Sequence, residues 1–315
     1  MSKKYFVTSD IHGYFDIFHD ALIRAGFDIE NPDHILIVCG DIFDRGNQPL
    51  EVYNFLKNLP RERRVLVRGN HEILLQSLVS RGYPCGHDYH NKTYDTLYQL
   101  IGMSYKEEQL KRTQMWANMP EYGTPEWEAF TKEVNEKDKK RDHRLFHNRK
   151  ISTILKWINS DEWVDYYELG PYIFVHAALP LTLLGENLWH PIYTLSPSWR
   201  ELSWEEARWE CPWKFYLKYG GSSELSDRIL VCGHWHTSDF WNNLVLKDKK
   251  QMDIAELNPI YLSKENPGLI GLDACTALTH GCNILVINED MSCIPHNHKD
   301  FNIEEFLSSE EETNG

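Results

Sequence analysis

The sequence predicts an α/β fold, because it combines a buried strand, a repeated strand-to-helix unit and polar residues at strand ends. The run from Ile35 to Cys39 is entirely apolar and stops at Gly40, which is typical of a strand whose sheet is covered by helices on both faces. Asp41, Asp44 and Arg45 follow at once. Ligands gather at the carboxyl ends of strands in such sheets, so this turn is the first candidate site. Taken alone, a surface turn with a solvated Asp-Arg pair is the alternative.

The composition is that of a globular protein with ample material for a core. Of the 315 residues, 42% are hydrophobic and 13% aromatic, and we expect a single domain over residues 1–315. A formal charge of −14 argues against electrostatic binding to nucleic acid or an anionic membrane. With no apolar signal region and no membrane-length apolar run, a cytoplasmic location is expected. The seven cysteines lack CxxC spacing and are interpreted as reduced thiols.

The first strand-to-helix unit lies at the N-terminus. A strand from Lys4 to Thr8 is followed by a turn with Asp10 and His12, and then by a helix over 14–25 that ends at Gly26. Asp10 and His12 are two positions apart, so an extended exit from the strand would place both side chains on one face, as a shared metal requires. A helix N-cap for Asp10 and a packed loop role for His12 are the alternatives.

Two further units repeat this order. The strand over 35–39 leads to a helix that begins at Pro49, a residue suited to the first helical turn. A third strand, over 64–68, is followed by the segment Gly69 to Glu72 and by the helical pattern of residues 73–79. Three successive strands therefore end in polar residues. This predicts a parallel sheet with its site along one edge.

From residue 81 to 163 the sequence is charged, aromatic and helical, and we interpret it as a helical insertion. Helices are predicted over 92–101, 105–118, 125–139 after an N-cap at Thr124, and 145–159. Strand patterns then resume over 164–169, 172–175 and 228–232, with a tryptophan-rich irregular stretch over 181–226. Two late strands, 269–273 and 282–286, are expected to pair as a hairpin. The acidic segment 296–315 is predicted to be a flexible tail.

Seven polar side chains at the predicted strand ends form a candidate metal site. They are Asp10, His12, Asp41, Asn70, His176, His234 and His236. Carboxylate, imidazole and amide groups suit manganese, iron or zinc. A carboxylate shared by two ions, which Asp41 could supply, holds them about 3.5 to 4 Å apart, close enough to share one hydroxide. The pattern indicates a two-metal hydrolytic centre that would attack a phosphorus in line.

Five blocks in this order, DxH, GDxxDRG, GNHE, a lone His after a strand and GHxH, resemble the calcineurin-like metallophosphoesterase superfamily. The intact GDxxDRG and GNHE blocks are most similar to its phosphoprotein (serine/threonine) phosphatase branch, particularly the bacterial type. The blocks span residues 10–236, and LDACTALTHGCN resembles the family's final hairpin. The resemblance implies a β-sandwich flanked by helices in four layers, α-β-β-α, with residues 81–163 as the insertion.

The resemblance also implies a role for each matched residue. One metal would be held by Asp10, His12, His236 and Asp41, and a second by Asp41, Asn70, His176 and His234. His71 would protonate the leaving group, with Asp44 hydrogen-bonded behind it. Arg45 would bind the phosphoryl oxygens in a bidentate fork, and Asn70 would also contact substrate. The family's second phosphate-binding arginine is assigned to Arg208, with Arg200 as the alternative.

Three functions remain open at this point. The first is hydrolysis of phosphomonoesters by a metal-bridging hydroxide, with phosphoserine or phosphothreonine in proteins as one substrate class. The second is a nucleotide pyrophosphohydrolase of the diadenosine tetraphosphatase kind, although such sequences usually lose the residue equivalent to Asp44. The third is a catalytically silent binding module.

We expect two divalent cations, Mn²⁺ first and Fe or Zn as alternatives, a phosphorylated substrate, and neither nucleic acid nor membrane as a partner. Departures from the family, such as the paired His234 and His236 and the long insertion, bear on the substrate and not on the reaction type.

Overall fold

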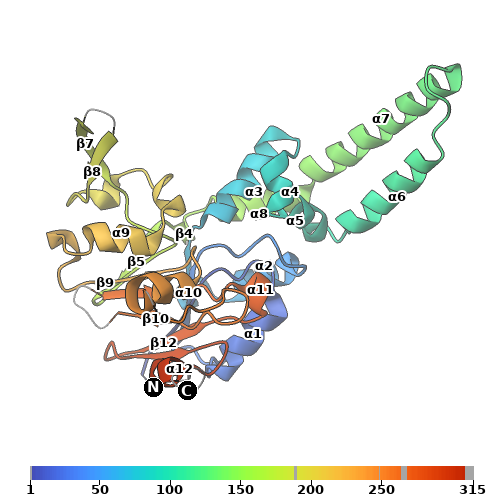
Figure 1. Ribbon diagram of the computed structural model, residues 1–315. Coiled ribbons are helices and arrows are strands. Elements are labelled where there is room, and N and C mark those ends of the chain that lie inside the picture. The colour runs from blue at the N-terminus through green and yellow to red at the C-terminus, as the bar shows by residue number, and fades with distance from the viewer. Residues whose placement is uncertain (1, 188–189, 248, 264–267, 309–315) are drawn as a thin grey trace.

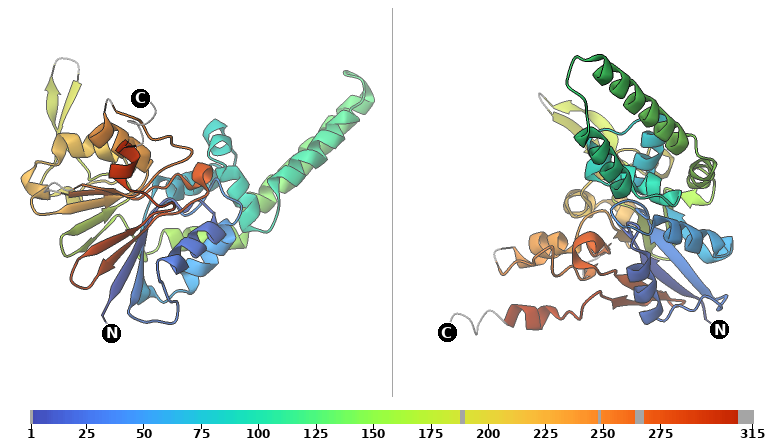
Figure 2. Two further views of the ribbon diagram at one scale, coloured as in Figure 1. Left: turned by 60° about the horizontal axis from the view of Figure 1, so that its bottom comes forward. Right: turned by 90° about the vertical axis from the view of Figure 1, so that its right-hand side faces the viewer.

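The computed structural model describes residues 2–187, 190–247, 249–263 and 268–308, and it confirms the four-layer α-β-β-α architecture. Two β-sheets pack face to face, and helices cover the outer face of each (Figures 1 and 2). Within these described ranges, no helix combines the length and the apolar character needed to cross a membrane.

The first sheet has six strands in the order β13-β12-β1-β2-β3-β4. The strands β1, β2, β3 and β4 run parallel, whereas β12 is antiparallel to both β1 and β13. The carboxyl ends of β1, β2 and β3 therefore lie along one edge of the sheet, and a polar turn follows each of them. The strand bounds are β1 Lys4–Thr8, β2 His34–Cys39, β3 Arg64–Val67, β4 Trp163–Val164, β12 Ile284–Asn288 and β13 Cys293–His296.

The second sheet has five strands in the order β10-β11-β9-β6-β5. The central strands β6, β9 and β11 are parallel, and β5 and β10 are antiparallel at the two edges. A separate hairpin joins β7 to β8. The bounds are β5 Tyr166–Leu169, β6 Tyr172–Val175, β7 Thr182–Asn187, β8 His190–Thr194, β9 Ile229–Cys232, β10 Tyr261–Leu262 and β11 Gly268–Gly271.

Successive side chains along a strand point to opposite faces of the sheet and so belong to different hydrophobic cores. In β2, Ile37 and Cys39 face the second sheet, whereas Leu36 and Val38 face the helices. In β9, Val231 faces the first sheet, whereas the residues on either side of it face the helices of the second sheet. Both faces of these strands are thus buried, which explains the unbroken apolar runs in the sequence.

The helices fall into two groups around the sheets. Those against the first sheet are α1 Phe15–Arg24, α2 Pro49–Asn58, α3 Asn70–Arg81, α5 Thr93–Leu100 and α8 Arg149–Ile158. Those against the second sheet are α9 Pro212–Tyr219 and α10 Thr237–Phe240. The remaining helices are α4 Gly86–His90, α6 Tyr105–Ala117, α7 Pro125–Phe146, α11 Thr276–Thr279 and α12 Ile303–Ser308. Short helical turns are η1 Arg61–Arg63, η2 Trp199–Glu201, η3 Ala207–Trp209, η4 Ser223–Leu225 and η5 Trp241–Leu246.

The helices predicted within residues 81–163 are present. Thr124 caps α7, because its hydroxyl accepts a hydrogen bond from Trp127 N. The helices α6 and α7 form an arm that projects from the body (Figure 1 and the left view of Figure 2). The helix α7 extends beyond the predicted residue 139, since its charged turns remain helical through Phe146. By contrast, α5 packs against the first sheet's helical layer.

One C-terminal prediction needs correction. The expected hairpin between 269–273 and 282–286 is wrong: β11 pairs with β9 and β10, whereas β12 pairs with β1 and β13. The backbone of each apolar run forms its hydrogen bonds in a different sheet, and the sequence does not reveal which sheet each run joins. The segment predicted as a flexible tail from residue 296 contains α12, and Phe301 packs on Trp241 with ring centroids 5.3 Å apart. The end of that predicted tail, 309–315, lies outside the described residues.

The stretch 181–226 is also more regular than predicted. It contains the β7-β8 hairpin, α9 and three short helical turns. Trp199 and Trp204 are buried against the second sheet, and their ring centroids are 5.8 Å apart. These tryptophans therefore belong mainly to the core of the second helical layer. Trp209 differs, because it is exposed and lines a cavity.

Candidate metal centre

The predicted ligands converge at the carboxyl ends of five strands, three from the first sheet and two from the second. Turns after β1, β2 and β3 supply Asp10, His12, Asp41 and Asn70, and turns after β6 and β9 supply the three remaining histidines. A cavity of about 520 Å³ opens here. Its lining is formed by Asp10, His12, Asp41, Arg45, Asn70, His71, Asn91, Trp209, His234, Trp235, His236, Asp239, Ile254 and Asp273.

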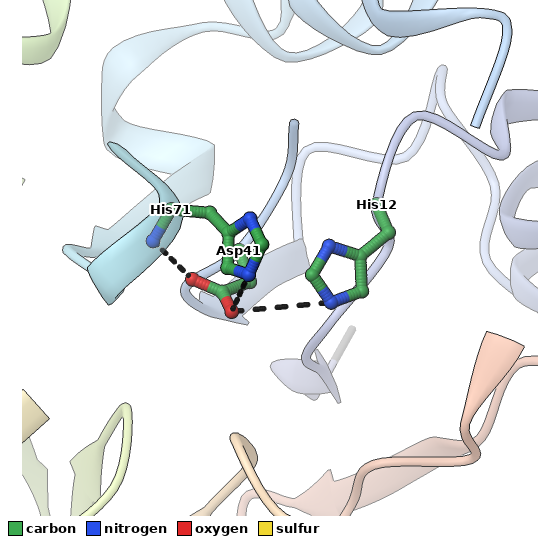
Figure 3. Close-up of side chains that lie close together, drawn as sticks. All are labelled: His12, Asp41 and His71. Atoms are coloured by element: carbon green, nitrogen blue, oxygen red, sulfur yellow. Dashed lines mark hydrogen bonds and ion pairs between the residues drawn. The ribbon is translucent and has the colours of Figure 1, made fainter. Parts of the chain in front are cut away.

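Asp41 lies at the centre of this group. Its Oδ2 is 3.9 Å from Nε2 of His12, 3.9 Å from Nε2 of His71 and 3.5 Å from Nε2 of His176. Its Oδ1 accepts a hydrogen bond from the backbone N–H of His71 at 2.9 Å, so the carboxylate is fixed from the α3 side (Figure 3). Burial acts to raise the pKa of Asp41, but the surrounding histidines outweigh it and lower that pKa. Asp41 is therefore placed to be shared by two ions.

Asp10 and His12 come together by a route different from the predicted one. Both residues have positive φ, 53° and 49°, so the chain leaving β1 turns and is not extended. Nε2 of His12 lies 3.9 Å from Oδ1 of Asp10, and Nδ1 of His12 donates to the carbonyl oxygen of Phe43 at 3.0 Å. Because the carbonyl only accepts, the lone pair of His12 is on Nε2, the atom that faces both carboxylates.

Asn70, His176 and His234 form a second group on the other side of Asp41. Nε2 of His176 lies 2.7 Å from Oδ1 of Asn70 and 3.1 Å from Nδ1 of His234. Nδ1 of His176 donates to the carbonyl oxygen of Cys39 at 2.9 Å, which again leaves the Nε2 lone pair facing the site. The backbone N–H of His234 donates to Oδ2 of Asp10 at 2.9 Å and so joins the two groups.

His236 has a carboxylate partner that sequence reasoning did not identify. Oδ2 of Asp273 lies 3.1 Å from Nδ1 of His236, and Asp273 is buried. Burial acts to lower the pKa of His236, but Asp273 outweighs it and raises that pKa to about 11. A carboxylate behind a histidine is a usual support for a metal ligand, since it fixes the orientation of the ring. The available signal was an acidic residue at the end of a predicted strand.

Glu72 is a second residue whose role the sequence did not reveal. Its carboxylate accepts hydrogen bonds from the backbone N–H groups of Asp41 (3.0 Å), Ile42 (3.0 Å) and Gly69 (2.8 Å). The Glu72 side chain is fully buried. It thereby ties the turn after β2 to the turn after β3. The last residue of the GNHE block is a structural clamp and does not line the cavity.

The close approach of these turns requires glycine at two positions. A Cβ at Gly69 would collide with Oδ1 of Asp41, and a Cβ at Gly233 would collide with Oδ2 of Asp10. Several residues that are not glycine also hold positive φ here, including Asp41 at 57°, Asp44 at 71° and His234 at 65°. Such strain concentrates at functional sites, where the surrounding structure maintains it.

His71 and Asp44 lie beside the centre, as the resemblance implied. Nδ1 of His71 is 2.7 Å from Oδ2 of Asp44, and both side chains are buried. Burial acts to lower the pKa of His71, but Asp41 and Asp44 outweigh it and raise that pKa. Arg45 follows Asp44 in the same turn and lines the cavity. The His71 imidazole and the Arg45 guanidinium therefore face one space, and the Asp44 carboxylate lies behind the imidazole.

Arg208 is not brought to the cavity lining. Its guanidinium forms an ion pair with Asp165, which also pairs with Arg68 at 3.2 Å. The alternative, Arg200, pairs with Glu168 at 2.7 Å. The structure thus gives neither arginine a place beside Arg45, and phosphate binding by Arg208 stays a prediction. The sequence showed only spacing, which does not reveal which carboxylate a guanidinium will meet.

The donor set fits divalent cations. Burial raises the pKa of Asp10, and the neighbouring charges of Asp273 and Asp41 raise it further. Burial lowers the pKa of His12, His176 and His234, that of His234 to about 4. Neutral imidazoles with inward lone pairs are in the protonation state that a metal requires of its ligands, and a bound cation would offset the repulsion between the buried carboxylates. The groups His12–Asp41–His71 and Asp41–His176–His234 each bring candidate ligand atoms within 4.8 Å.

The β-sandwich fold and the candidate His/Asp metal ligands at its edge point to the phosphoesterase class. A model of the family described as calcineurin-like phosphoesterase matches residues 3–238. The chain belongs to that family. Its members depend on two metal ions, and the His/Asp groups described above are candidate ligands for such ions. A search of curated proteins found no match.

Solved structures resemble the chain at low identity. A putative diadenosine tetraphosphatase is 14% identical, with 96% of each chain covered and a TM-score of 0.43. A metallophosphoesterase from Sphaerobacter thermophilus is 12% identical over 100% of this chain and 95% of that one, with a TM-score of 0.41. A serine/threonine phosphatase from Saccharomyces cerevisiae, similar to human phosphatase PP5, is 12% identical over 96% and 81%, with a TM-score of 0.47. These similarities bear on neither substrate nor residue roles.

Proposed function

We propose that this protein hydrolyses phosphomonoesters with the help of two divalent cations, and that phosphoserine or phosphothreonine is one substrate class. The observation that carries the proposal is the position of the Asp41 carboxylate, whose Oδ2 lies within 4 Å of three imidazole nitrogens. One ion would be held by Asp10, His12, Asp41 and His236, and the other by Asp41, Asn70, His176 and His234. When bound, such ions supply Lewis acidity and an activated water.

The chain's own residues would then orient the ester and manage its proton. Arg45 would grip two phosphoryl oxygens, since its planar guanidinium matches them in a bidentate fork. Asn70 would also contact the phosphoryl group beside it. His71 would give its Nε2 proton to the leaving oxygen, and Asp44, at Nδ1, would fix the ring and stabilise the imidazolium. Manganese is the first choice of metal, with iron and zinc as the alternatives, because oxygen and imidazole ligands suit all three.

The test compares substrates and metals on one preparation. Chelator-treated protein is assayed with p-nitrophenyl phosphate, a phosphoserine peptide and diadenosine tetraphosphate, each with and without added Mn²⁺, Fe²⁺ or Zn²⁺. The proposal expects manganese-dependent turnover of p-nitrophenyl phosphate and of the peptide. Preferential cleavage of diadenosine tetraphosphate would instead identify a nucleotide pyrophosphohydrolase. Absence of turnover with all three substrates, in protein that binds the metals, would reject an enzymatic role.

A further inference from the structure

We propose that helix α5 of the helical insertion belongs to the catalytic machinery, because Thr93 and Thr96 position the Asp44 carboxylate that orients His71. This inference rests on the proposed function, in which His71 is the proton donor. It extends that function into a segment for which the sequence predicted only helices, and it makes the two threonines positioning residues.

The contacts are short and buried. Oγ1 of Thr93 donates to Oδ2 of Asp44 at 2.6 Å, and Oγ1 of Thr96 donates to Oδ1 of the same carboxylate at 2.8 Å. His71 Nδ1 approaches Oδ2 at 2.7 Å. Both threonines and Asp44 are fully buried, and His71 is 2% exposed. The carboxylate therefore has three donors within the protein and little access to water.

The Asp44 carboxylate accepts hydrogen bonds from two threonines of α5 and from one histidine of α3. These three donors restrict its orientation more than a single donor could. A carboxylate held only by His71 could turn about its Cβ–Cγ bond, since that bond has a broad rotational preference. Thr93 and Thr96 hold the two oxygens separately, so the plane of the group is set before His71 meets it. The orientation of the imidazole then follows from that plane. Proton transfer depends on such geometry, because the donor must lie within hydrogen-bond reach of the leaving oxygen.

The helix α5 is built to hold the threonines in place. Thr93 and Thr96 are three positions apart in its first turn, so they share one face. Leu97 and Leu100 are fully buried in the core of the first sheet's helical layer. At the N-cap, Nζ of Lys92 reaches the carbonyl oxygen of Arg45 at 3.4 Å. The turn that carries Asp44 and Arg45, both at positive φ, is thus braced by the insertion.

The decisive variant is Thr93→Val with Thr96→Val, which removes both hydroxyl donors at nearly constant volume. Turnover is measured with p-nitrophenyl phosphate, phenyl phosphate and phosphoserine, a series in which the leaving group becomes poorer. We expect the loss relative to wild type to be about tenfold greater for phenyl phosphate and phosphoserine than for p-nitrophenyl phosphate, since only poor leaving groups need the proton. Metal content by elemental analysis should stay at the wild-type level.

Two controls separate positioning from folding. Thr93→Ser with Thr96→Ser keeps both hydroxyls and should restore the wild-type leaving-group dependence. Leu97→Ala weakens the packing of the same helix and leaves both threonine hydroxyls in place. It should lower the melting temperature while reducing turnover of all three esters by the same factor. A valine variant that behaves like Leu97→Ala would overturn the inference.

A spectroscopic readout keeps the inference testable without turnover. In protein labelled with ¹⁵N-histidine, the His71 Nδ1 proton is identified as the resonance lost in His71→Asn. We expect it to be strongly deshielded in wild type and to move upfield in the valine pair. An unchanged resonance would contradict the role of the threonines. Wild-type protein inactive toward every ester would reject the proposed function, whereas the resonance would still report the contact.

Discussion

Nε2 of His176 lies 3.1 Å from Nδ1 of His234, although 58 positions separate the two residues in the chain. Because the other nitrogen of His176 donates to the Cys39 carbonyl, its Nε2 can only accept at this point. One ion with metal–nitrogen bonds of about 2.1 Å would suit two imidazoles at this separation. The pair is thus poised for coordination, and its neighbour Asp41 is the residue that both proposed ions share.

Asp41→Asn should abolish both metal binding and turnover. Elemental analysis should find less than one ion per chain, and Mn²⁺ should no longer raise the melting temperature. In wild type, Mn²⁺ at a hundred times its dissociation constant should stabilise the fold by about 2.7 kcal/mol. Asp161→Asn, at an exposed residue, is the matched control. A fully loaded Asp41→Asn protein would refute the shared role.

His71→Asn should leave the metals in place and slow hydrolysis most for poor leaving groups. The asparagine cannot protonate the departing oxygen, so phenyl phosphate should lose roughly 10² to 10⁴ in turnover. The loss for p-nitrophenyl phosphate should be much smaller. Steady-state kinetics on the two esters, with metal content measured in parallel, check this expectation. An equal loss on both esters would count against proton donation.

Glu72→Gln should destabilise the fold and weaken metal binding. The amide group replaces one of the two oxygens that now accept three backbone N–H bonds, so at least one buried donor loses its partner. We expect a cost of roughly 2 kcal/mol in the free energy of unfolding. Urea denaturation measures it, with Glu51→Gln on the solvent side of α2 as the control. If the two variants unfolded at the same urea concentration, Glu72 would not be a clamp.

Glu162 should make stability depend on acid pH. Burial acts to raise its pKa, but Lys57, Arg64 and the Trp157 N–H outweigh it and lower that pKa to about 2, from an ordinary value of 4.5. A lowered folded-state pKa gives stability that is complete above pH 4.5 and is lost as the pH falls toward 2.

Glu162→Gln should therefore cost roughly 1–2 kcal/mol near neutral pH, allowing for solvent screening, and progressively less below pH 4.5. Denaturation of wild type and variant across this pH range gives the difference directly. Glu133→Gln, which breaks the exposed pair with Lys137, should show almost no such effect. If the difference in the free energy of unfolding between wild type and Glu162→Gln stayed the same down to pH 2, the charge of Glu162 would contribute nothing to stability.

Much of the fold was accessible from the sequence because its signals are local. The apolar run over 35–39 is buried on both faces, and Thr124 and Pro49 stand at helix starts as predicted. The sequence did not reveal which strands the two late strands pair with. Residues 269–271 and 284–286 are both apolar and close in sequence, yet they belong to different sheets, because the choice depends on which edge is free in three dimensions.

The sequence by itself determined which polar side chains stand at strand ends, because their positions follow from the chain's own order of apolar runs and turns. Only the tertiary structure decided what surrounds them. Asp273 reaches His236, Glu72 ties two turns together, and Thr93 and Thr96 reach Asp44 from the insertion. Most of these contacts join residues far apart in sequence, and a single threonine or glutamate carries no local mark of the distant partner that packing will bring to it.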